Sequence, residues 1–203
     1  METSPVNPLT RTTRRKRVNP RVQLDRGNWI ENAIEVLARE GLGGLRVEVL
    51  AKRCGVTKGS FYWHFKDRHD LLTAMLEHWR EGRIRDIEKV TTVKPGMERE
   101  QLHYAIEVYG ASRNRKGMAI ELAVRDWARH DPQAAAVVEA VDLYRLECTR
   151  KLFVAAGMSD AEAKSRSLLL YACVFGLSLM HYTHFDNNLD DLKERIAERI
   201  VSA

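Results

Sequence analysis

Proline is sparse and unevenly placed in this chain of 203 residues. Three of the five prolines, Pro5, Pro8 and Pro20, fall at the N-terminus, and only Pro95 and Pro132 follow them. Because proline interrupts helices and central strands, the chain after residue 20 has only two forced breaks. The long stretches between these breaks combine charged and apolar residues in a way that favours helices over strands. We therefore expect an all-α protein.

The excess of positive charge lies in one N-terminal segment. Residues 3–24 contain six basic residues and no acid, and basic and acidic residues balance beyond residue 24, so this segment accounts for the net charge of +5. It is poor in apolar residues, so we expect residues 1–24 to form a flexible basic arm that is attracted to polyanions. A solvated tail without a partner is the alternative. The candidate DNA contacts in the arm are Arg14, Arg15, Lys16 and Arg17.

The cysteines indicate the cellular compartment of the protein rather than a catalytic or metal-binding role. Cys54, Cys148 and Cys173 are odd in number, far apart, and without the paired spacing of metal ligands. Reduced thiols in a cytoplasmic protein explain them most simply. No apolar segment follows the basic arm, as a targeting peptide would require.

Few residues suggest catalysis or metal binding. His181 and His184, with Asp186 nearby, are the best candidates for a metal site, but no further ligands stand at a fitting spacing. The chain has no glycine-rich phosphate loop and no G-x-S-x-G motif, and carboxylates such as Glu121 and Asp126 fit charged helix patterns. We therefore predict no metal, no cofactor and no enzyme, although a catalytic pocket without a motif stays open.

Capping signals and apolar spacing predict about nine helices. The first begins after Asp25, which suits an N-cap, and ends at Gly41, which suits a C-cap. Further helices are expected over residues 45–55, 57–65, 67–90, 96–112 and 117–129, from about 132, and over 160–185 and 189–201.

The stretch GVTKGSFYWHF, residues 55–65, contains more aromatic rings than a short helix needs for packing. At 100° per residue Phe61 and Phe65 share one face and should anchor the helix on the core, whereas Trp63 points the opposite way with Gly59. A large ring beside a residue without a side chain suits a surface that enters a groove. Packing of Trp63 and Tyr62 on neighbouring helices is the alternative. Together with the preceding helix and the turn at Gly55, this segment has helix-turn-helix spacing.

At these residues the chain resembles the TetR family of bacterial transcriptional regulators. The resemblance covers about residues 25–76, and its most specific part is the stretch just quoted. It implies a homodimer that binds a palindromic double-stranded DNA operator, most often as a repressor, and leaves it when a small-molecule effector binds. By position, Thr57, Lys58, Gly59, Ser60 and Trp63 resemble groove-facing residues, and Tyr62, His64 and Arg68 resemble phosphate contacts or their supports.

We expect two folded units after the arm. Residues 25–70 should form a three-helix DNA-binding domain, and residues 71–203 a helical effector-binding and dimerisation domain. No charged residue occurs from Ser167 to Phe185, but polar groups within that run argue against a membrane span. A helix that is apolar nearly all round is instead expected to be buried on several sides, here against a second copy of the chain. The dimerisation candidates are Leu168, Phe175, Leu177 and Ile196.

An effector pocket is expected among the fourth to eighth helices. Aromatic and thioether side chains recur there at inward-facing positions, as in sites for small, mostly apolar molecules. The candidates are Met75, Trp79, Tyr104, Tyr109, Trp127 and Tyr144. These rings are also explained by core packing alone. A helical ligand-binding or adaptor protein that does not bind an operator is the alternative function.

Overall fold

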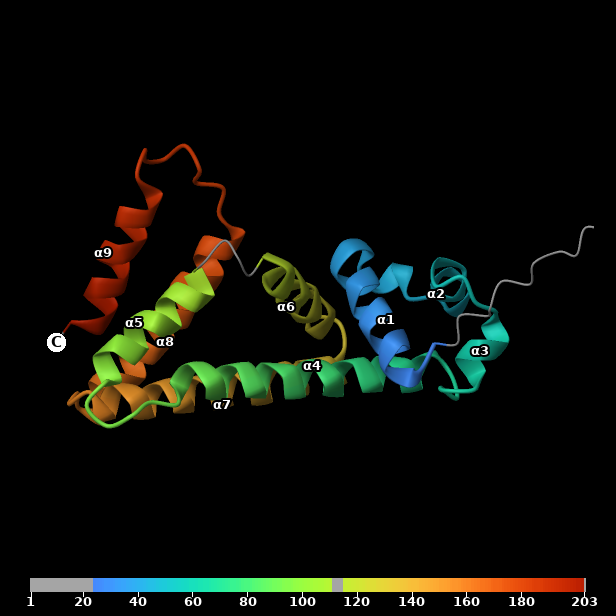
Figure 1. The fold of residues 1–203 in the computed structure, drawn as a ribbon, viewed down its shortest axis with the longest axis horizontal. Helices are drawn as coiled ribbons and strands as arrows, with labels where there is room; N and C mark the ends of the chain where they lie inside the picture. Colours follow the sequence, from blue (N-terminus) through green and yellow to red (C-terminus); the bar gives the residue numbers. More distant parts are fainter. Residues whose placement is uncertain (1–23, 111–114, 203) are drawn as a thin grey trace, which may run out of the picture.

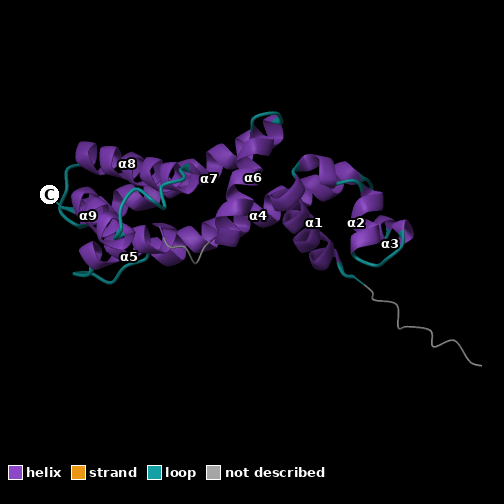
Figure 2. Cartoon of the chain, turned by 90° about the horizontal axis from the view of Figure 1, so that it is seen from above, coloured by secondary structure: helices purple, strands orange, loops and turns teal. Residues whose placement is uncertain are grey.

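The computed structural model describes residues 24–110 and 115–202, and within these ranges the chain contains only helices (Figures 1 and 2). This confirms the all-α prediction and the expected number of about nine helices. The helices are α1 (Arg26–Glu40), the short 3-10 helix η1 (Leu42–Gly44), α2 (Val47–Arg53), α3 (Lys58–Tyr62), α4 (Arg68–Thr91), α5 (Glu98–Gly110), α6 (Arg115–Ala128), α7 (Pro132–Ala155), α8 (Asp160–Leu179) and α9 (Leu189–Val201).

The ends of α1 follow its capping residues. The Asp25 carboxylate accepts from the backbone N–H of Asn28 over 2.7 Å, and the Asn28 side chain accepts from the backbone N–H of Asp25. This reciprocal pair satisfies two donors at the first turn. At the other end Gly41 has φ +66°, a conformation that favours glycine. Both predicted caps of this helix are therefore confirmed.

α3 and α8 end several residues earlier than predicted. α3 ends at Tyr62, three residues early, and the chain then closes with a bond from the His64 N–H to the Phe61 carbonyl over 2.9 Å. α8 ends at Leu179 rather than Phe185. Residues 181–185 are histidine, tyrosine, threonine, histidine and phenylalanine, all of modest helix propensity. Within the described ranges, no helix combines the length and apolar character needed to cross a membrane.

Two long helices set the shape of the molecule. α4 and α7 each contain 24 residues and lie against one another along its long axis (Figure 1). The helices α1, α2 and α3 gather at one end, and α5, α8 and α9 at the other. α6 lies between the two groups and packs on both α1 and α7. α6 is thus positioned to connect the two ends.

The apolar residues form two cores. The first joins Trp29 of α1 and Phe61 of α3 to Trp79 of α4 and Trp127 of α6. The second lies at the opposite end and includes Phe153 of α7 and residues of α5, α8 and α9. Because the first core continues from α1–α3 into α4, α6 and α7, packing crosses the expected boundary at residue 70. The division into residues 25–70 and 71–203 stays a prediction.

Candidate functional site

The helices α2 and α3 are joined by a tight turn. Gly55 in this turn has φ +68°, which a residue with a side chain rarely adopts. The next residue, Val56, donates its N–H to the Ala51 carbonyl over 3.0 Å and so closes the end of α2. Ala51 itself is buried. A glycine and a small buried residue at these places let α3 cross close to α2.

Aromatic side chains fix α3 on the first core. Phe61 and Phe65 are buried and stacked, with ring centroids 5.2 Å apart. Trp29 of α1 meets the Phe61 ring edge-on at 5.5 Å. The guanidinium of Arg26 lies over the outer side of the cluster, 4.5 Å from the centroid of Phe65. The predicted anchoring role of Phe61 and Phe65 is confirmed.

The opposite side of this segment faces outward. Trp63 is 87% exposed and Tyr62 is 59% exposed, although Tyr62 also contacts the edge of the Phe61 ring. The alternative in which Trp63 is buried against a neighbouring helix is therefore wrong for the isolated chain. Of the remaining groove-facing candidates, Thr57, Lys58 and Gly59 are exposed and Ser60 is half-buried. His64, a candidate phosphate contact or support, is also half-buried. An exposed indole without an intramolecular packing partner is unusual on a monomer surface.

Lys58 has a partner that sequence reasoning did not identify. Its Nζ lies 2.5 Å from Oε1 of Glu48 in α2, and both side chains are more than half exposed. The hydrogen bond from Lys58 lowers the pKa of the Glu48 carboxyl. Glu48 and Lys58 are ten residues apart, in different helices, so no periodicity within one helix relates them. The ammonium of Lys58, at the start of α3, is thus partly neutralised.

Arg68, a candidate phosphate contact, is engaged within the chain. Its Nε donates to the Leu45 carbonyl over 2.7 Å, and its Nη2 donates to the Leu42 carbonyl over 3.1 Å. These bonds connect the first residue of α4 to the turn between α1 and α2. A contact between Arg68 and phosphate stays a prediction. The arm residues Arg14, Arg15, Lys16 and Arg17 lie outside the described residues.

The six effector candidates do not surround one cavity. Met75, Trp79 and Trp127 are buried in the first core, whereas Tyr104 on α5 is 44% exposed. The Tyr144 hydroxyl donates to Glu88 over 2.8 Å, and this hydrogen bond raises the pKa of Tyr144 to about 12. The side chain of Tyr109 lies outside the described part of the chain. Tyr144 also packs against the first core, so four of the candidates share that core as packing residues, and helical periodicity alone could not distinguish core packing from a ligand site.

A surface groove of about 600 Å³ runs between α1 and α6. Its walls include Leu37 and Leu42 on the α1 side and Ala123 and Trp127 on the α6 side. Trp127 is the one effector candidate that lines it. The volume lies within the range of small-molecule sites.

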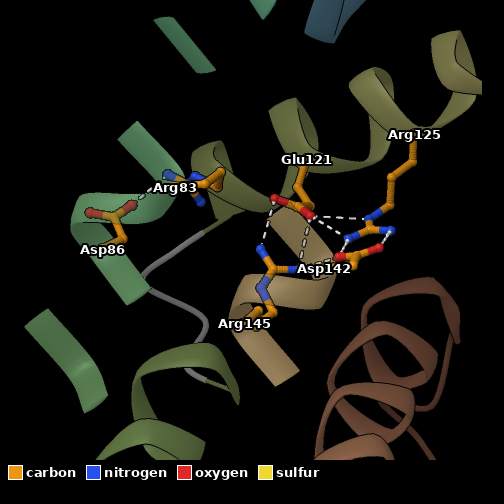
Figure 3. Close-up of polar contacts among 6 residues, drawn as sticks. All are labelled: Arg83, Asp86, Glu121, Arg125, Asp142 and Arg145. Carbon is orange, nitrogen blue, oxygen red and sulfur yellow. Dashed lines mark hydrogen bonds and ion pairs between the residues drawn. The ribbon is translucent and has the colours of Figure 1, made fainter. Parts of the chain in front are cut away.

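A charged cluster lies between α6 and α7 (Figure 3). Glu121 is 2% exposed and Arg145 is 3% exposed, and their side chains meet at 3.3 Å. Arg125 bonds Glu121 over 2.8 Å and Asp142 over 2.6 Å, so two guanidiniums and two carboxylates are interlinked. Glu121 thus pairs within a charged pattern of α6, as expected, but it is buried rather than solvated. α7 covers that face of α6 and supplies the buried counter-charge, which the local sequence pattern does not reveal.

The environment of Arg125 explains how charge is maintained in this cluster. Burial alone would lower the pKa of Arg125, because the charged form loses water. The hydrogen bond to Asp142 and the charges of Glu121 and Asp142 outweigh this effect, so the pKa of Arg125 is raised. The guanidinium also lies 4.2 Å from the ring centroid of Phe175 on α8. Arg125 thus connects α6, α7 and α8.

The outer face of α8 is apolar and exposed. Leu168 is 62% exposed and Leu179 is 64% exposed, and Leu169 and Met180 are similar. Among the other dimerisation candidates, Phe175, Leu177 and Ile196 are half-buried. Phe175 and Ile196 pack against the second core. The strongest candidates for contact with another molecule are therefore the exposed leucines at the two ends of α8.

Comparison with known proteins shows which proteins this chain resembles. Residues 30–75 match the family described as bacterial regulatory proteins, tetR family. The chain is 26% identical over 201 residues to the HTH-type transcriptional regulator AcrR of Shigella flexneri, covering 92% of this chain and 90% of AcrR. The tetracycline repressor protein class C of Escherichia coli is 42% identical over 55 residues, which span only 25% of that protein.

A solved structure supports the fold over most of the chain. A transcriptional regulator from Rhodococcus sp. Rha1 superposes with a TM-score of 0.70 at 19% identity, covering 88% of this chain and 94% of that one. The matched residues 30–75 contain most of α1, the α2–α3 pair and the start of α4. Residues 30–75 therefore belong to the tetR family of bacterial regulatory proteins, and the chain as a whole shares the fold of a solved transcriptional regulator.

Proposed function

We propose that this chain is a cytoplasmic repressor that binds a palindromic double-stranded DNA operator as a homodimer. A small, mostly apolar effector releases it from the operator. The proposal assigns the DNA surface to α3 and the residues beside it, the dimer surface to α8, and the effector to the helical unit formed by α4–α8. No catalytic step is part of this function.

The observation that carries the proposal is the exposure of Trp63. A ring that is 87% exposed, next to the exposed Lys58 and Gly59, is held at a fixed position because Phe61 and Phe65 are buried behind it. A glycine at this place lets DNA backbone or bases approach the helix closely. A helix of a helix-turn-helix inserts such a surface into the major groove.

The outer face of α8 supports the homodimer. A row of exposed leucines along one helix is a surface that a two-fold axis can bury against its own copy. A single helix-turn-helix makes few base contacts, and two copies placed one helical turn of DNA apart read a palindrome.

The position of α6 supports transmission between effector and DNA surface. Met118 and Glu121 line a small, partly open cavity next to α7 and α8, whereas Ala119 and Ala123 line the open groove against α1. Lys116 is also paired with Glu35 of α1 at 2.6 Å. A ligand that displaces α6 from its inner side would push it toward α1, where the groove offers room. Such a ligand acts only to the extent that it prefers one of the two arrangements.

Fluorescence anisotropy of a labelled operator duplex tests the proposal with two matched variants. Trp63→Ala should weaken binding at least about tenfold, as expected for loss of a central aromatic contact. Tyr104→Ala removes an exposed ring on α5, 44% exposed, and should leave affinity unchanged. Equal affinities of both variants and the unaltered chain would mean that α3 is not part of the DNA-binding surface.

A further inference from the structure

The small, partly open cavity next to the charged cluster has two hydrogen-bond donors without partners among the described residues. Its volume is about 10 Å³, and it is lined by residues of α4, α6, α7 and α8 that include Arg83 and Arg145. The Nε atoms of both arginines are buried and have no hydrogen-bond partner among the described residues. Buried donors in folded proteins are nearly always paired, so two orphans beside one cavity indicate a missing acceptor.

The charges around the cavity are already balanced. Figure 3 shows three guanidiniums and three carboxylates, in which Arg83 pairs with Asp86 at 2.6 Å and the other four groups interlink. An anionic ligand would add a buried negative charge without a free cation, and Glu121 would repel it. A neutral oxygen would instead accept from the orphan donors and leave the charge balance unchanged. The cavity therefore requires an acceptor rather than an anion.

Apart from Tyr171, whose hydroxyl lies 3.0 Å from the Thr149 hydroxyl, the remaining walls are apolar and adaptable. Met118, Val174 and Phe175 line the cavity, and Gly117 contributes no side chain. At its present volume the cavity holds about one water molecule. Met118 is the side chain that can enlarge it, because an unbranched thioether repacks with little strain. A ligand that enters here thus places an oxygen at the arginines and an apolar body against methionine, valine and phenylalanine.

We propose that the effector is a neutral carbonyl compound, such as a ketone, ester or amide with an apolar body, whose oxygen accepts from Nε of Arg83 and Arg145. This inference rests on the proposed function, because it names the chemical class of the effector. It also specifies that the effector contacts α6 at Met118, next to Glu121.

Three probes of similar size test whether the site prefers a neutral acceptor, a molecule without an acceptor or an anion. Acetophenone has a neutral acceptor, ethylbenzene has none, and benzoate has an anionic one. Binding to the full-length chain is measured without DNA, by the dependence of the melting temperature on probe concentration. Acetophenone should bind about tenfold more tightly than ethylbenzene, the ratio expected for a hydrogen bond to a charged donor, and more tightly than benzoate.

Matched variants locate the site. Arg83→Met removes one orphan donor while keeping an apolar stem, and its partner Asp86 is largely exposed, so the fold should hold. Arg80→Met is the control: Arg80 precedes Arg83 by one turn of α4 and also has an unpaired buried Nε, but in the described structure it does not line the cavity. Met118→Trp should fill the cavity and abolish binding.

The proposal predicts that acetophenone binding falls about tenfold in Arg83→Met, is lost in Met118→Trp and is unchanged in Arg80→Met. Tighter binding of benzoate, equal binding of all three probes, or no binding of any probe would overturn it. Operator binding is measured separately on the same samples. A chain that binds its operator but not acetophenone would contradict this inference alone, whereas failure to bind any operator would contradict the proposed function.

Discussion

The guanidinium of Arg68 holds the start of α4 against the turn that precedes α2, because its Nε donates to the carbonyl oxygen of Leu45 over 2.7 Å. A second bond, from Nη2 to the Leu42 carbonyl, spans the same turn at 3.1 Å. The residue that resembles a phosphate contact therefore also maintains the frame on which α2 and α3 are mounted.

Replacement of Arg68 should affect stability as well as DNA binding. Arg68→Ala leaves two carbonyls without these donors and should lower the free energy of unfolding by about 1 kcal/mol, measured by urea denaturation. If Arg68 also contacts a phosphate, the slope of log affinity for the operator against log salt should become shallower by about one. Lys66→Ala, at an exposed cation two residues earlier, is the control for stability. Unfolding at the same urea concentration in Arg68→Ala and the unaltered chain would contradict the structural role.

The pair between Lys58 and Glu48 should restrain DNA binding. Glu48→Gln frees the Lys58 ammonium and removes a negative charge beside α3, so affinity for duplex DNA at low salt should rise. The slope of log affinity against log salt should steepen by up to about one. Glu77→Gln, which removes a similarly exposed carboxylate paired with Arg80 on α4, should leave both quantities unchanged. An unaltered affinity in Glu48→Gln would mean that Lys58 does not approach DNA.

Local periodicity explains why the buried and exposed sides of residues 57–65 were predictable from the sequence. Phe61, Phe65 and Trp63 lie within five residues, so a 3.6-residue repeat suffices to assign buried and exposed sides. The pairing of Lys58 with Glu48 and of Glu121 with Arg145 depends on how separate helices meet. No short-range pattern contains that information. The effector candidates do not line one cavity for a related reason, since an inward-facing position does not specify whether a side chain fills the core, as Met75 and Trp79 do, or lines a ligand site.

The basic arm should contribute through charge rather than through folding. Deleting residues 1–21 removes six basic residues, so operator affinity should fall, most strongly at low salt. Thermal unfolding should be unchanged, because α1 begins only at Arg26. Anisotropy titrations of both forms at two salt concentrations measure the effect. Equal low-salt affinities would make the arm a tail without a role in binding.

The exposed face of α8 gives a direct test of the homodimer. Leu168→Glu places a charge at a position that is 62% exposed in the single chain, so the fold should persist while dimers dissociate. Operator affinity should be lost together with the dimer. Met97→Glu, at a position that is 51% exposed before α5, is the control. Sedimentation velocity distinguishes dimers from monomers. A Leu168→Glu variant that stays dimeric would exclude this face of α8 as the dimer interface. Ile196 is a less suitable probe than Leu168, because it packs against the second core.

The proposed function requires that two copies of the α3 surface bind a palindrome sequence-specifically. Selecting duplexes from a random double-stranded DNA library with the full-length chain tests this requirement. The proposed function predicts enrichment of an inverted repeat whose half-site centres lie about 34–36 Å apart, one helical turn of DNA. It also predicts that Trp63→Ala no longer enriches this repeat. Recovery of no preferred sequence, or of an unrepeated sequence that Trp63→Ala enriches equally, would contradict it.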